Sequence, residues 1–468
     1  MPPLRVPAAI FREYDIRGKA DQHLTSELFL SLGRAFVDLL APVPAAAGRP
    51  RVAVGRDCRL SSQRLRDALI EGLLAAGADV TDVGVGPTPM LYFAVQHLGV
   101  DAGMMITGSH NPADENGVKM LRRTGSIYGE EIQKLKELVE HGASASRLRG
   151  ALEVVDVQRA YVDYMRANIH LSPEAKAGLG IVVDAGNGAA GPLALAAMRA
   201  LGLSPEALYC EMDGTFPNHH PDPTQPENVA ELIAKVKETR ARVGIAFDGD
   251  GDRLGAIDAD GDIVWGDRLV TLFARDILRE RPGAAILGEV KCSQTMYDDI
   301  AKHGGRAILW KTGHSLIKAK MKEEQALLAG EMSGHMFFAD RYFGYDDAIY
   351  AALRLIEILA REGKSIGELL ADVPRMHVTP EIRVDAEDAT KFRIVEAVRR
   401  HYRQKLGPER VIEVDGARVL FPNGWGLVRA SNTQPALVVR FEADTAAHRD
   451  AIRAEVEAVI ASARASLH

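Results

Sequence analysis

Cysteine is scarce in this chain, and the few cysteines form no recognisable pattern. The 468 residues include three of them, Cys58, Cys210 and Cys292, which lie far apart and form no C-x-x-C pair. An odd number of widely spaced cysteines supports neither a disulfide framework nor a zinc site. We therefore expect a protein of a reducing compartment.

Long apolar runs and basic tracts are also missing. No window of about 18 consecutive apolar residues occurs, and the start, Met-Pro-Pro-Leu-Arg-Val, lacks the basic and apolar regions of a secretion signal. The formal net charge is −7 and no Lys/Arg-rich stretch is present, so the chain has no electrostatic footprint for nucleic acid. We expect a cytoplasmic protein that binds neither membranes nor nucleic acids.

The length and the apolar pattern predict several α/β domains. At about 150 residues per domain, the chain has room for three or four separate domains. The apolar run Val52–Val54 precedes a helical pattern over 65–76, and Ile181–Val183 precedes another over 193–201. This alternation is typical of α/β domains with mainly parallel or mixed sheets.

The C-terminal part has a different pattern. Three candidate strands, Val411–Val414, Ala417–Leu420 and Ala436–Phe441, precede a helical pattern over 452–460. This order predicts a separate α+β domain. Candidate domain boundaries are the polar stretches near residues 150, 258–261 and 374–380.

The most informative segment is an acidic loop at residues 247–254, Phe-Asp-Gly-Asp-Gly-Asp-Arg-Leu. Asp248, Asp250 and Asp252 alternate with glycine, and carboxylates this close repel one another unless a cation lies between them. The glycines at 249 and 251 allow the backbone to turn until all three side chains face one point. Ligation by oxygen alone favours Mg²⁺, Mn²⁺ or Ca²⁺. Because the flanking runs predict strands, we expect a Mg²⁺ loop at a strand end.

An EF-hand calcium loop is the main competing interpretation, since it also begins D-x-D-x-D. That loop requires glycine at its sixth position and a bidentate glutamate at its twelfth. This chain has Arg253 and Ala259 at those positions. The EF-hand is therefore rejected, and a solvated acidic turn is the remaining alternative.

Three other motifs do not hold up as functional sites. Gly186-Asn-Gly-Ala-Ala-Gly191 has the spacing of a dinucleotide-binding turn, but two residues separate it from the strand, so a tight strand-to-helix turn is favoured. Gly363-Lys-Ser365 lacks the earlier glycine of a Walker A loop, because position 358 is isoleucine. Gly313-His-Ser315 lacks the closing glycine of a nucleophile elbow, because position 317 is isoleucine.

A nucleophile is expected in the turn Thr-Gly-Ser-His-Asn-Pro at 107–112, which follows the apolar run Ala102–Ile106. Taken together with the acidic loop, Ser109 at a strand end is a candidate phosphoryl carrier. Its neighbour Gly108 allows a phosphate to approach the backbone.

Four segments follow one another along almost the whole chain: the serine turn, Asp-Gly-Asp-Gly-Asp-Arg at 248–253, Gly-Glu-Met-Ser-Gly-His at 330–335 and Arg-Ala-Ser-Asn-Thr at 429–433. Together with Phe11–Gly18, they resemble the α-D-phosphohexomutases, in particular the bacterial phosphomannomutase/phosphoglucomutase group. The resemblance implies three consecutive α/β domains with mixed sheets plus a C-terminal α+β domain, arranged around a central cleft. The expected limits are 1–153, 154–258, 259–374 and 375–468.

The resemblance also implies a role for each motif. Ser109 would be the phosphoserine and would hold one Mg²⁺ together with Asp248, Asp250 and Asp252. Glu331 and Ser333 would bind sugar hydroxyls. The nonreacting phosphate of the substrate would be held by Arg429, Ser431, Asn432 and Thr433. Further residues that match the family's site are Tyr14, Arg17, Lys119, Arg253, Lys291, Gly313, His314 and His335.

Charge counting agrees with this assignment. Three aspartates contribute −3 and a phosphoserine about −2, so one Mg²⁺ leaves the cluster near −3. Further cations are needed, and Lys119 and Arg253 are the nearest candidates. His335, Lys119 and Arg17 are all candidates to manage the proton of the substrate hydroxyl, and the sequence does not choose among them.

The implied reaction is the reversible interconversion of a hexose 1-phosphate and a hexose 6-phosphate, with glucose, mannose or both as the sugar. Phospho-Ser109 would donate its phosphoryl group to the free hydroxyl, and the hexose 1,6-bisphosphate would turn over and return the other one. The same bisphosphate is the expected activator, and we expect a monomer. Alternatives are a phosphoglucosamine mutase, a Mg²⁺-dependent sugar-phosphate phosphatase and a nonenzymatic sugar-phosphate-binding protein. A packed aromatic role for Tyr14 and a surface position for Lys291 also remain open.

Overall fold

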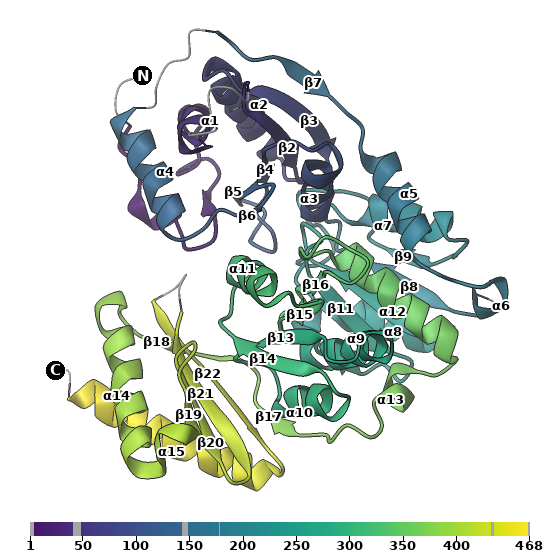
Figure 1. Ribbon diagram of the computed structural model, residues 1–468, viewed down its shortest axis with the longest axis vertical. Coiled ribbons are helices and arrows are strands. Elements are labelled where there is room, and N and C mark those ends of the chain that lie inside the picture. The colour runs from purple at the N-terminus through teal and green to yellow at the C-terminus, as the bar shows by residue number, and fades with distance from the viewer. Residues whose placement is uncertain (1–3, 41–47, 143–147, 177, 432–434, 467–468) are drawn as a thin grey trace.

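Four β-sheets follow one another along the chain, and helices pack against each of them (Figure 1). The computed structural model describes residues 4–40, 48–142, 148–176, 178–431 and 435–466. Asn432 and Thr433, two of the expected phosphate ligands, lie outside these residues. No helix in the described part has the length and apolarity needed to cross a membrane.

The first sheet is mixed, and its central strands lead into the serine turn. β2 (Arg51–Arg56) is parallel to both β3 (Asp79–Val85) and β4 (Ala102–Ile106), and β5 (Glu115–Arg122) runs antiparallel to β4. The flanking strands are β1 (Ile16–Lys19), β6 (Gly125–Ser126) and β7 (Leu152–Val154). The helices of this part are α1 (Ser26–Leu40), α2 (Ser62–Ala75), α3 (Thr88–His97) and α4 (Glu130–His141).

The second sheet places the acidic loop at the end of a hairpin. β10 (Val243–Phe247) is parallel to β8 (Ile181–Asp184) and antiparallel to β11 (Leu254–Asp258), with Phe247 opposite Leu254. The acidic loop is thus the connection that closes the β10–β11 hairpin. The sheet also contains β9 (Glu206–Leu208) and β12 (Ile263–Val264). Its helices are α5 (Gln158–Asn168), α6 (Pro173–Lys176), α7 (Gly191–Ala200) and α8 (Ala230–Thr239).

The third sheet is also mixed, and the turn expected to bind sugar connects two of its strands. β13 (Ala285–Glu289) is parallel to β14 (Arg306–Trp310) and β15 (Leu328–Gly330), and β16 (Met336–Phe338) pairs antiparallel with β15. The helices are α9 (Gly266–Glu280), α10 (Gln294–Lys302), α11 (His314–Glu324), α12 (Ala348–Glu362) and α13 (Ile366–Leu369). Gly363 follows the last residue of α12 and caps the helix with φ = +65°, a left-handed conformation that glycine favours at this position.

The fourth sheet is antiparallel throughout and is covered by two long helices. Its strands are β17 (His377–Val378), β18 (Ile382–Asp385), β19 (Val411–Ile412), β20 (Ala417–Phe421), β21 (Gly424–Ala430) and β22 (Ala436–Ala443). The helices are α14 (Asp388–Leu406) and α15 (Ala446–Ala465).

Three mixed-sheet α/β parts followed by an α+β part confirm the predicted fold class. The strand expected at 411–414 is shorter, since β19 stops at Ile412, and β21 was not predicted. The exact domain limits stay predictions.

One large apolar cluster spans the first three sheets, in addition to smaller clusters that belong to each of them, and the fourth sheet takes no part in it. Buried residues of α3, of the β8–β10 region and of α9 and α12 form one continuous cluster, which contains Phe93, Phe247, Phe273 and Ile349. The fourth sheet packs on a separate cluster around Tyr402. Because burial of apolar surface is the main stabilising term, the first three parts are held together as one body.

Candidate active site

The acidic loop forms a compact group of buried carboxylates. Asp248, Asp250 and Asp252 are all fully buried, and one oxygen from each lies within 4.8 Å of the others. One carboxylate oxygen of Asp250 and one of Asp252 have no hydrogen-bond partner among the described residues. Buried charge without a partner is strongly unfavourable, and an all-oxygen donor set is what hard divalent cations bind. These residues therefore fit a Mg²⁺ ion.

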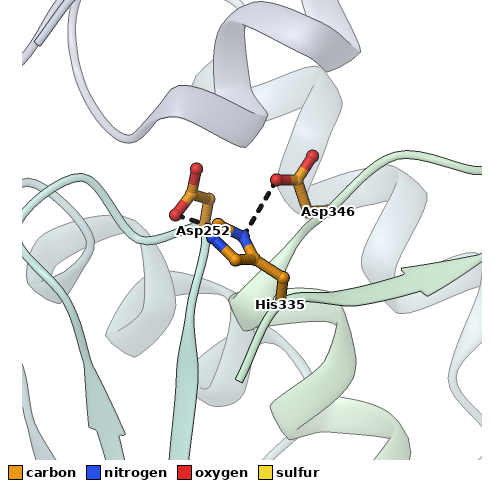
Figure 2. A group of neighbouring side chains, drawn as sticks. All are labelled: Asp252, His335 and Asp346. Atoms are coloured by element: carbon orange, nitrogen blue, oxygen red, sulfur yellow. Dashed lines mark ion pairs between the residues drawn. The ribbon is translucent and has the colours of Figure 1, made fainter. Parts of the chain in front are cut away.

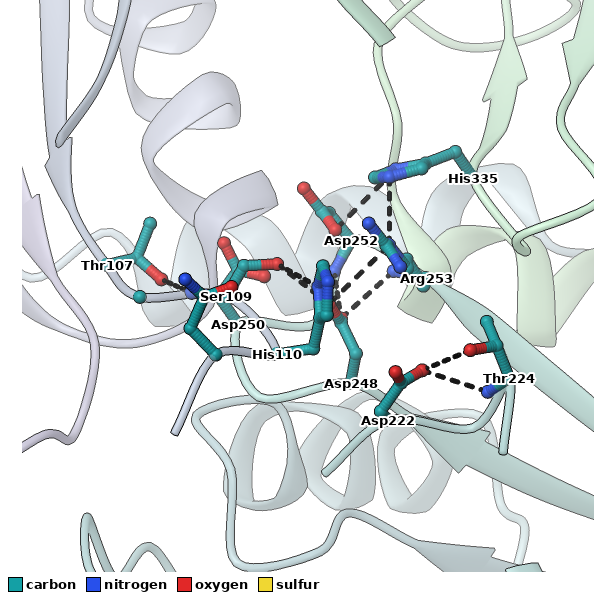
Figure 3. A network of polar contacts seen from close by, with 12 residues as sticks. Thr107, Ser109, His110, Asp222, Thr224, Asp248, Asp250, Asp252, Arg253 and His335 are labelled. Atoms are coloured by element: carbon teal, nitrogen blue, oxygen red, sulfur yellow. Dashed lines mark hydrogen bonds and ion pairs between the residues drawn. The ribbon is translucent and has the colours of Figure 1, made fainter. Parts of the chain in front are cut away.

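Ser109 lies directly against this group. Its Oγ donates a hydrogen bond of 3.1 Å to Asp248 Oδ2, although the two residues are 139 positions apart (Figure 3). Ser109 adopts φ = +50°, which is uncommon for a residue other than glycine, and its N–H donates to Thr107 Oγ1 at 2.8 Å. A Cβ at Gly249 would lie 2.3 Å from the Ser109 carbonyl oxygen, so the two loops can meet only because position 249 has no side chain.

A buried arginine holds the backbone of the serine turn in place. Arg59 donates to the carbonyl oxygens of Ser109 at 2.9 Å, of Asn111 at 2.6 Å and of Glu115 at 2.9 Å. Its Nε lies 3.2 Å from a carboxylate oxygen of Asp57. Arg59 thus fixes the backbone on both sides of the candidate nucleophile.

Lys119 is the closest cation to the acidic group. Its Nζ donates to Asp250 Oδ2 at 2.7 Å and also contacts Asp252 Oδ2. Burial alone would lower the pKa of Lys119, but Asp250 and Asp252 raise it above the ordinary value. Lys119 therefore stays protonated and serves as a fixed positive charge.

The aspartates of the loop differ in their proton affinity. Burial, reinforced by Asp252 and Asp250, raises the pKa of Asp248 well above its usual range. Burial also acts on Asp250, but Lys119 and the hydroxyl of Thr88, which donates at 2.5 Å, hold its pKa below the usual value. A cation in this group would favour the charged form of every carboxylate that binds it.

Arg253 and His335 meet on the far side of the acidic loop. Arg253 Nε donates to His335 Nε2 at 3.0 Å and lies 4.0 Å from Asp248 Oδ2. Because Nε2 accepts this bond, the ring hydrogen of a neutral His335 is assigned to Nδ1. Nδ1 lies 3.0 Å from Asp346 Oδ2 and 3.6 Å from Asp252 Oδ1, and Figure 2 shows the two carboxylates on either side of the ring. Asp346 in turn pairs with Lys318 at 2.9 Å.

The expected sugar-binding residue Glu331 lies against the start of α11. Glu331 is buried, and its Oε1 accepts a hydrogen bond of 2.7 Å from the N–H of Gly313. The Tyr14 hydroxyl donates to the Thr312 carbonyl at 3.0 Å, and its ring lies 5.8 Å from that of His314. A Cβ at Gly313 would lie 2.5 Å from the Tyr14 ring, so this contact requires glycine. Ser333 lies half-buried in the turn between β15 and β16.

The described residues of the expected phosphate clamp, Arg429 and Ser431, lie on the fourth sheet at the end of β21. Arg429 is buried, and its Nε donates to Asp415 Oδ2 at 3.0 Å, while the same oxygen accepts from the N–H of Thr312 at 3.0 Å. Lys291 is buried as well, which excludes a surface position, and its Nζ lies 3.0 Å from Glu381 Oε2. This ammonium is the main cause that lowers the pKa of Glu381 to about 2.

Arg17 lies on the other side of the serine turn. Its Nε donates to Asp15 at 2.7 Å, and its guanidinium contacts the Gly108 carbonyl oxygen. Burial alone would lower the pKa of Arg17, but Asp15 and Asp250 raise it, so the side chain remains charged.

Several residues of the site were not predicted from the sequence. His110 Nδ1 lies 3.1 Å from Ser109 Oγ, and burial, with Arg253 nearby, lowers the pKa of His110 well below its usual range. His110 belongs to the serine turn, so its position in the motif was an available signal. Thr88, Arg59 and Asp346 carry no such signal, because each reaches the site from a segment with ordinary local sequence.

Family models match all four parts of the chain. Residues 8–146 match "Phosphoglucomutase/phosphomannomutase, alpha/beta/alpha domain I", residues 159–261 match domain II, and residues 265–376 match domain III. Residues 381–459 match the C-terminal domain of the same family.

Curated and solved relatives cover nearly the full length. The chain is 49% identical to a phosphomannomutase/phosphoglucomutase of Pseudomonas aeruginosa over 440 residues, which is 94% of this chain and 93% of that protein. It is 44% identical to a phosphoglucomutase of Neisseria gonorrhoeae, with 97% of each chain covered. A phosphoglucomutase/phosphomannomutase family protein of Burkholderia thailandensis superposes with a TM-score of 0.89 at 42% identity over 98% of both chains. The chain therefore belongs to the phosphoglucomutase/phosphomannomutase family.

Proposed function

We propose that this protein is a mutase that interconverts hexose 1-phosphates and hexose 6-phosphates, with glucose and mannose as the sugars. The observation that carries the proposal is the 3.1 Å contact of Ser109 Oγ with the buried acidic group. A hydroxyl next to a cation-binding cluster is placed to carry a phosphoryl group. The names of the relatives from Pseudomonas and Neisseria agree with this activity.

Ser109, Asp248, Asp250 and Asp252 would hold one Mg²⁺ ion. When bound, the ion neutralises charge on the phosphoryl oxygens and so favours transfer of the phosphoryl group. Lys119 adds a fixed positive charge beside Asp250 and Asp252. Arg253 adds another, 4.0 Å from Asp248.

In the forward step, the Oγ–P bond of phospho-Ser109 breaks and an O–P bond to the free sugar hydroxyl forms. The hydroxyl loses its proton and Ser109 Oγ gains one, so charge and atoms balance over the step. Of the three candidates for the proton transfer, Lys119 and Arg17 are held in their charged forms. We assign the proton transfer to His335: Asp346 holds the ring at Nδ1, and Arg253 has to release Nε2 before that nitrogen takes the proton of the substrate hydroxyl.

A mutase must also hold the second phosphate at a distance from the reaction. We assign that role to Arg429 and Ser431, together with Asn432 and Thr433, because a guanidinium binds phosphate through two parallel hydrogen bonds. Glu331, Ser333 and His314 would bind sugar hydroxyls, and Tyr14 and Gly313 form the wall beside them. Lys291 supplies a further cation near Arg429. The hexose 1,6-bisphosphate would be both intermediate and activator, and a monomeric state and a cytoplasmic location stay predictions.

The test is a parallel assay of glucose 1-phosphate, mannose 1-phosphate and glucosamine 1-phosphate, with free phosphate measured in the same samples. We expect turnover of the first two sugars, stimulation by hexose 1,6-bisphosphate and little free phosphate. Fastest turnover of the amino sugar would instead indicate a phosphoglucosamine mutase. Stoichiometric release of phosphate would indicate a phosphatase and would refute the proposal.

A further inference from the structure

One cavity outside the proposed active site lies between the first and third sheets. Its volume is about 590 Å³, which is in the range of ligand-binding pockets. One wall is the β5–β6 hairpin with Arg122 and Arg123, and the other is α11 with Lys318 and Lys322. Lys322 Nζ joins the two walls, because it donates to the Thr124 carbonyl at 3.3 Å. Figure 1 shows α11 next to the β5–β6 hairpin.

The lining of this cavity carries positive charge only. Four basic side chains and no carboxylate line it, on a chain whose formal net charge is −7. Arg122 pairs with Glu131, and Lys318 pairs with Asp346. Arg123 and Lys322 donate only to carbonyl oxygens, and no carboxylate in the described ranges pairs with either of them. A cavity with two uncompensated cations attracts an anion.

Aromatic rings form another part of the wall. Phe343 lines the cavity and is 42% exposed, which is unusual for a phenylalanine in this structure. Its ring is parallel to that of Tyr345, with centroids 5.9 Å apart. Tyr92 also lines the cavity, and Lys318 Nζ lies 4.6 Å from its ring centre. An exposed flat ring is a surface on which the flat ring of a ligand can stack.

We propose that this cavity binds a nucleoside phosphate, a ligand that combines a multiply charged anion with a flat ring. Arg123 and Lys322 would contact the phosphates, and the base would stack on Phe343. The cavity is large enough for both the phosphates and the base. The basic side chains match the phosphates, and the exposed aromatic ring next to them matches the base. This site is separate from the substrate site proposed above.

The cavity is connected to the proposed active site by a short chain of contacts. Lys318 in its wall pairs with Asp346 at 2.9 Å, and Asp346 lies 3.0 Å from His335 Nδ1. A phosphate near Lys318 competes with Asp346 for its ammonium and weakens the hold of Asp346 on His335. Occupancy of the cavity therefore lowers turnover. This second step, unlike the binding itself, rests on the proposed function.

Binding is tested with ATP as the probe, by calorimetric titration of the full chain with glucose 1,6-bisphosphate in excess to occupy the active site. The test variant is the double substitution Arg123→Glu and Lys322→Glu. The matched control is Lys134→Glu with Arg166→Glu, which makes the same charge change at two exposed helix positions away from the cavity. Adenosine and tripolyphosphate probe the ring and the anion separately.

We expect ATP to bind the wild type and the control equally and to bind the test variant at least about tenfold more weakly. Adenosine and tripolyphosphate should each bind more weakly than ATP. Equal ATP binding by the test variant, or no binding by the wild type, would overturn the site.

Turnover is then measured at fixed free Mg²⁺ with and without ATP. Without ATP, all three proteins should have the same rate, because none of the changed residues belongs to the proposed reaction. ATP should lower kcat of the wild type and the control but not of the test variant. Bound ATP without a change in kcat would refute the connection through Lys318. ATP binding in a chain that turns over no hexose phosphate would refute the proposed function and leave the site intact.

Discussion

The substitution Lys119→Met tests the electrostatic design of the site. Methionine has a similar length and no charge, so it removes the ammonium and leaves the packing nearly unchanged. Lys119 is 3% exposed and contacts two of the fully buried aspartates. Its loss leaves Asp250 and Asp252 without their nearest positive partner.

The expected loss of stability follows from these contacts. Removal of one partner from a buried ion pair costs about 3–5 kcal/mol, because the remaining charge is buried without compensation. The wild-type pKa of Asp250 lies below its unfolded value, so this stabilisation is present above the unfolded pKa and is lost as pH falls through the folded one. At pH 7 without Mg²⁺, the variant should therefore be less stable by about 3–5 kcal/mol.

The affinity for Mg²⁺ should rise in the variant, whereas the stability falls. The acidic group gains one unit of negative charge in the variant, and the attraction of a divalent cation rises by several kcal/mol at most before screening. We expect Mg²⁺ to bind the variant roughly tenfold to a hundredfold more tightly. Turnover should still fall strongly, since the charge that faces the transferred phosphoryl group is missing.

Chemical unfolding in EDTA and in Mg²⁺, together with calorimetric titration of Mg²⁺, measures both effects. The matched control is Lys136→Met, because Lys136 forms only a partly exposed pair with Glu140 at 3.8 Å. That change should cost less than about 1 kcal/mol and leave Mg²⁺ affinity unaltered. If Lys119→Met keeps wild-type stability in EDTA, or binds Mg²⁺ more weakly, the assigned role of Lys119 is wrong.

Three further substitutions test the nucleophile, the clamp and the loop contact. Ser109→Ala should reduce kcat by several orders of magnitude with substrate binding retained, and phosphate detected on the variant by mass spectrometry would contradict the carrier role. Arg429→Ala should raise KM for both sugar phosphates by about tenfold to a hundredfold through loss of a charged hydrogen bond, and an unchanged KM would move the clamp elsewhere. Gly249→Ala should abolish turnover, because its Cβ would lie 2.3 Å from the Ser109 carbonyl. Gly367→Ala, whose Cβ would meet nothing closer than 3.6 Å, should leave the rate unaltered, and equal rates for both variants would refute the contact.

Local features of the sequence predicted the elements that carry the site. The acidic loop and its flanking strands were predictable, because the alternating glycines and the short apolar runs that indicate them lie within a few residues of one another. β21 was missed, since Gly424 and Gly426 are poor strand formers and the strand is stabilised by its neighbours β20 and β22. The pairing of strands far apart in sequence overrides the local propensity there.

The contacts that complete the site were not predictable in this way. The role of Arg59 depends on four carbonyl oxygens at least 50 positions further along the chain, and no local pattern indicates such bonds. The position of Asp346 beside His335 depends likewise on the turn from β16 to α12. The family resemblance supplied the residues of the site, but it did not supply the partners that orient them.

The fourth part has a core separate from the cluster that joins the first three, and this separation bears on how the active site excludes water. Ser109, the acidic loop and His335 belong to the three parts that one apolar cluster joins, and this cluster holds their geometry together. The clamp residue Arg429 belongs to the fourth part, which joins the third through a small apolar cluster around Trp425. The other links are polar, such as the bond of Arg418 to the Cys292 carbonyl at 2.8 Å.

An interface with many polar links is typical of parts that move relative to each other. The bisphosphate has to turn over between two transfers, and the phosphoserine has to be protected from hydrolysis during each one. We propose that the fourth part closes for transfer and opens for reorientation, because a rigid reaction centre with a mobile clamp meets both needs. The polar links to the third part are then the contacts that such a movement has to break and form again.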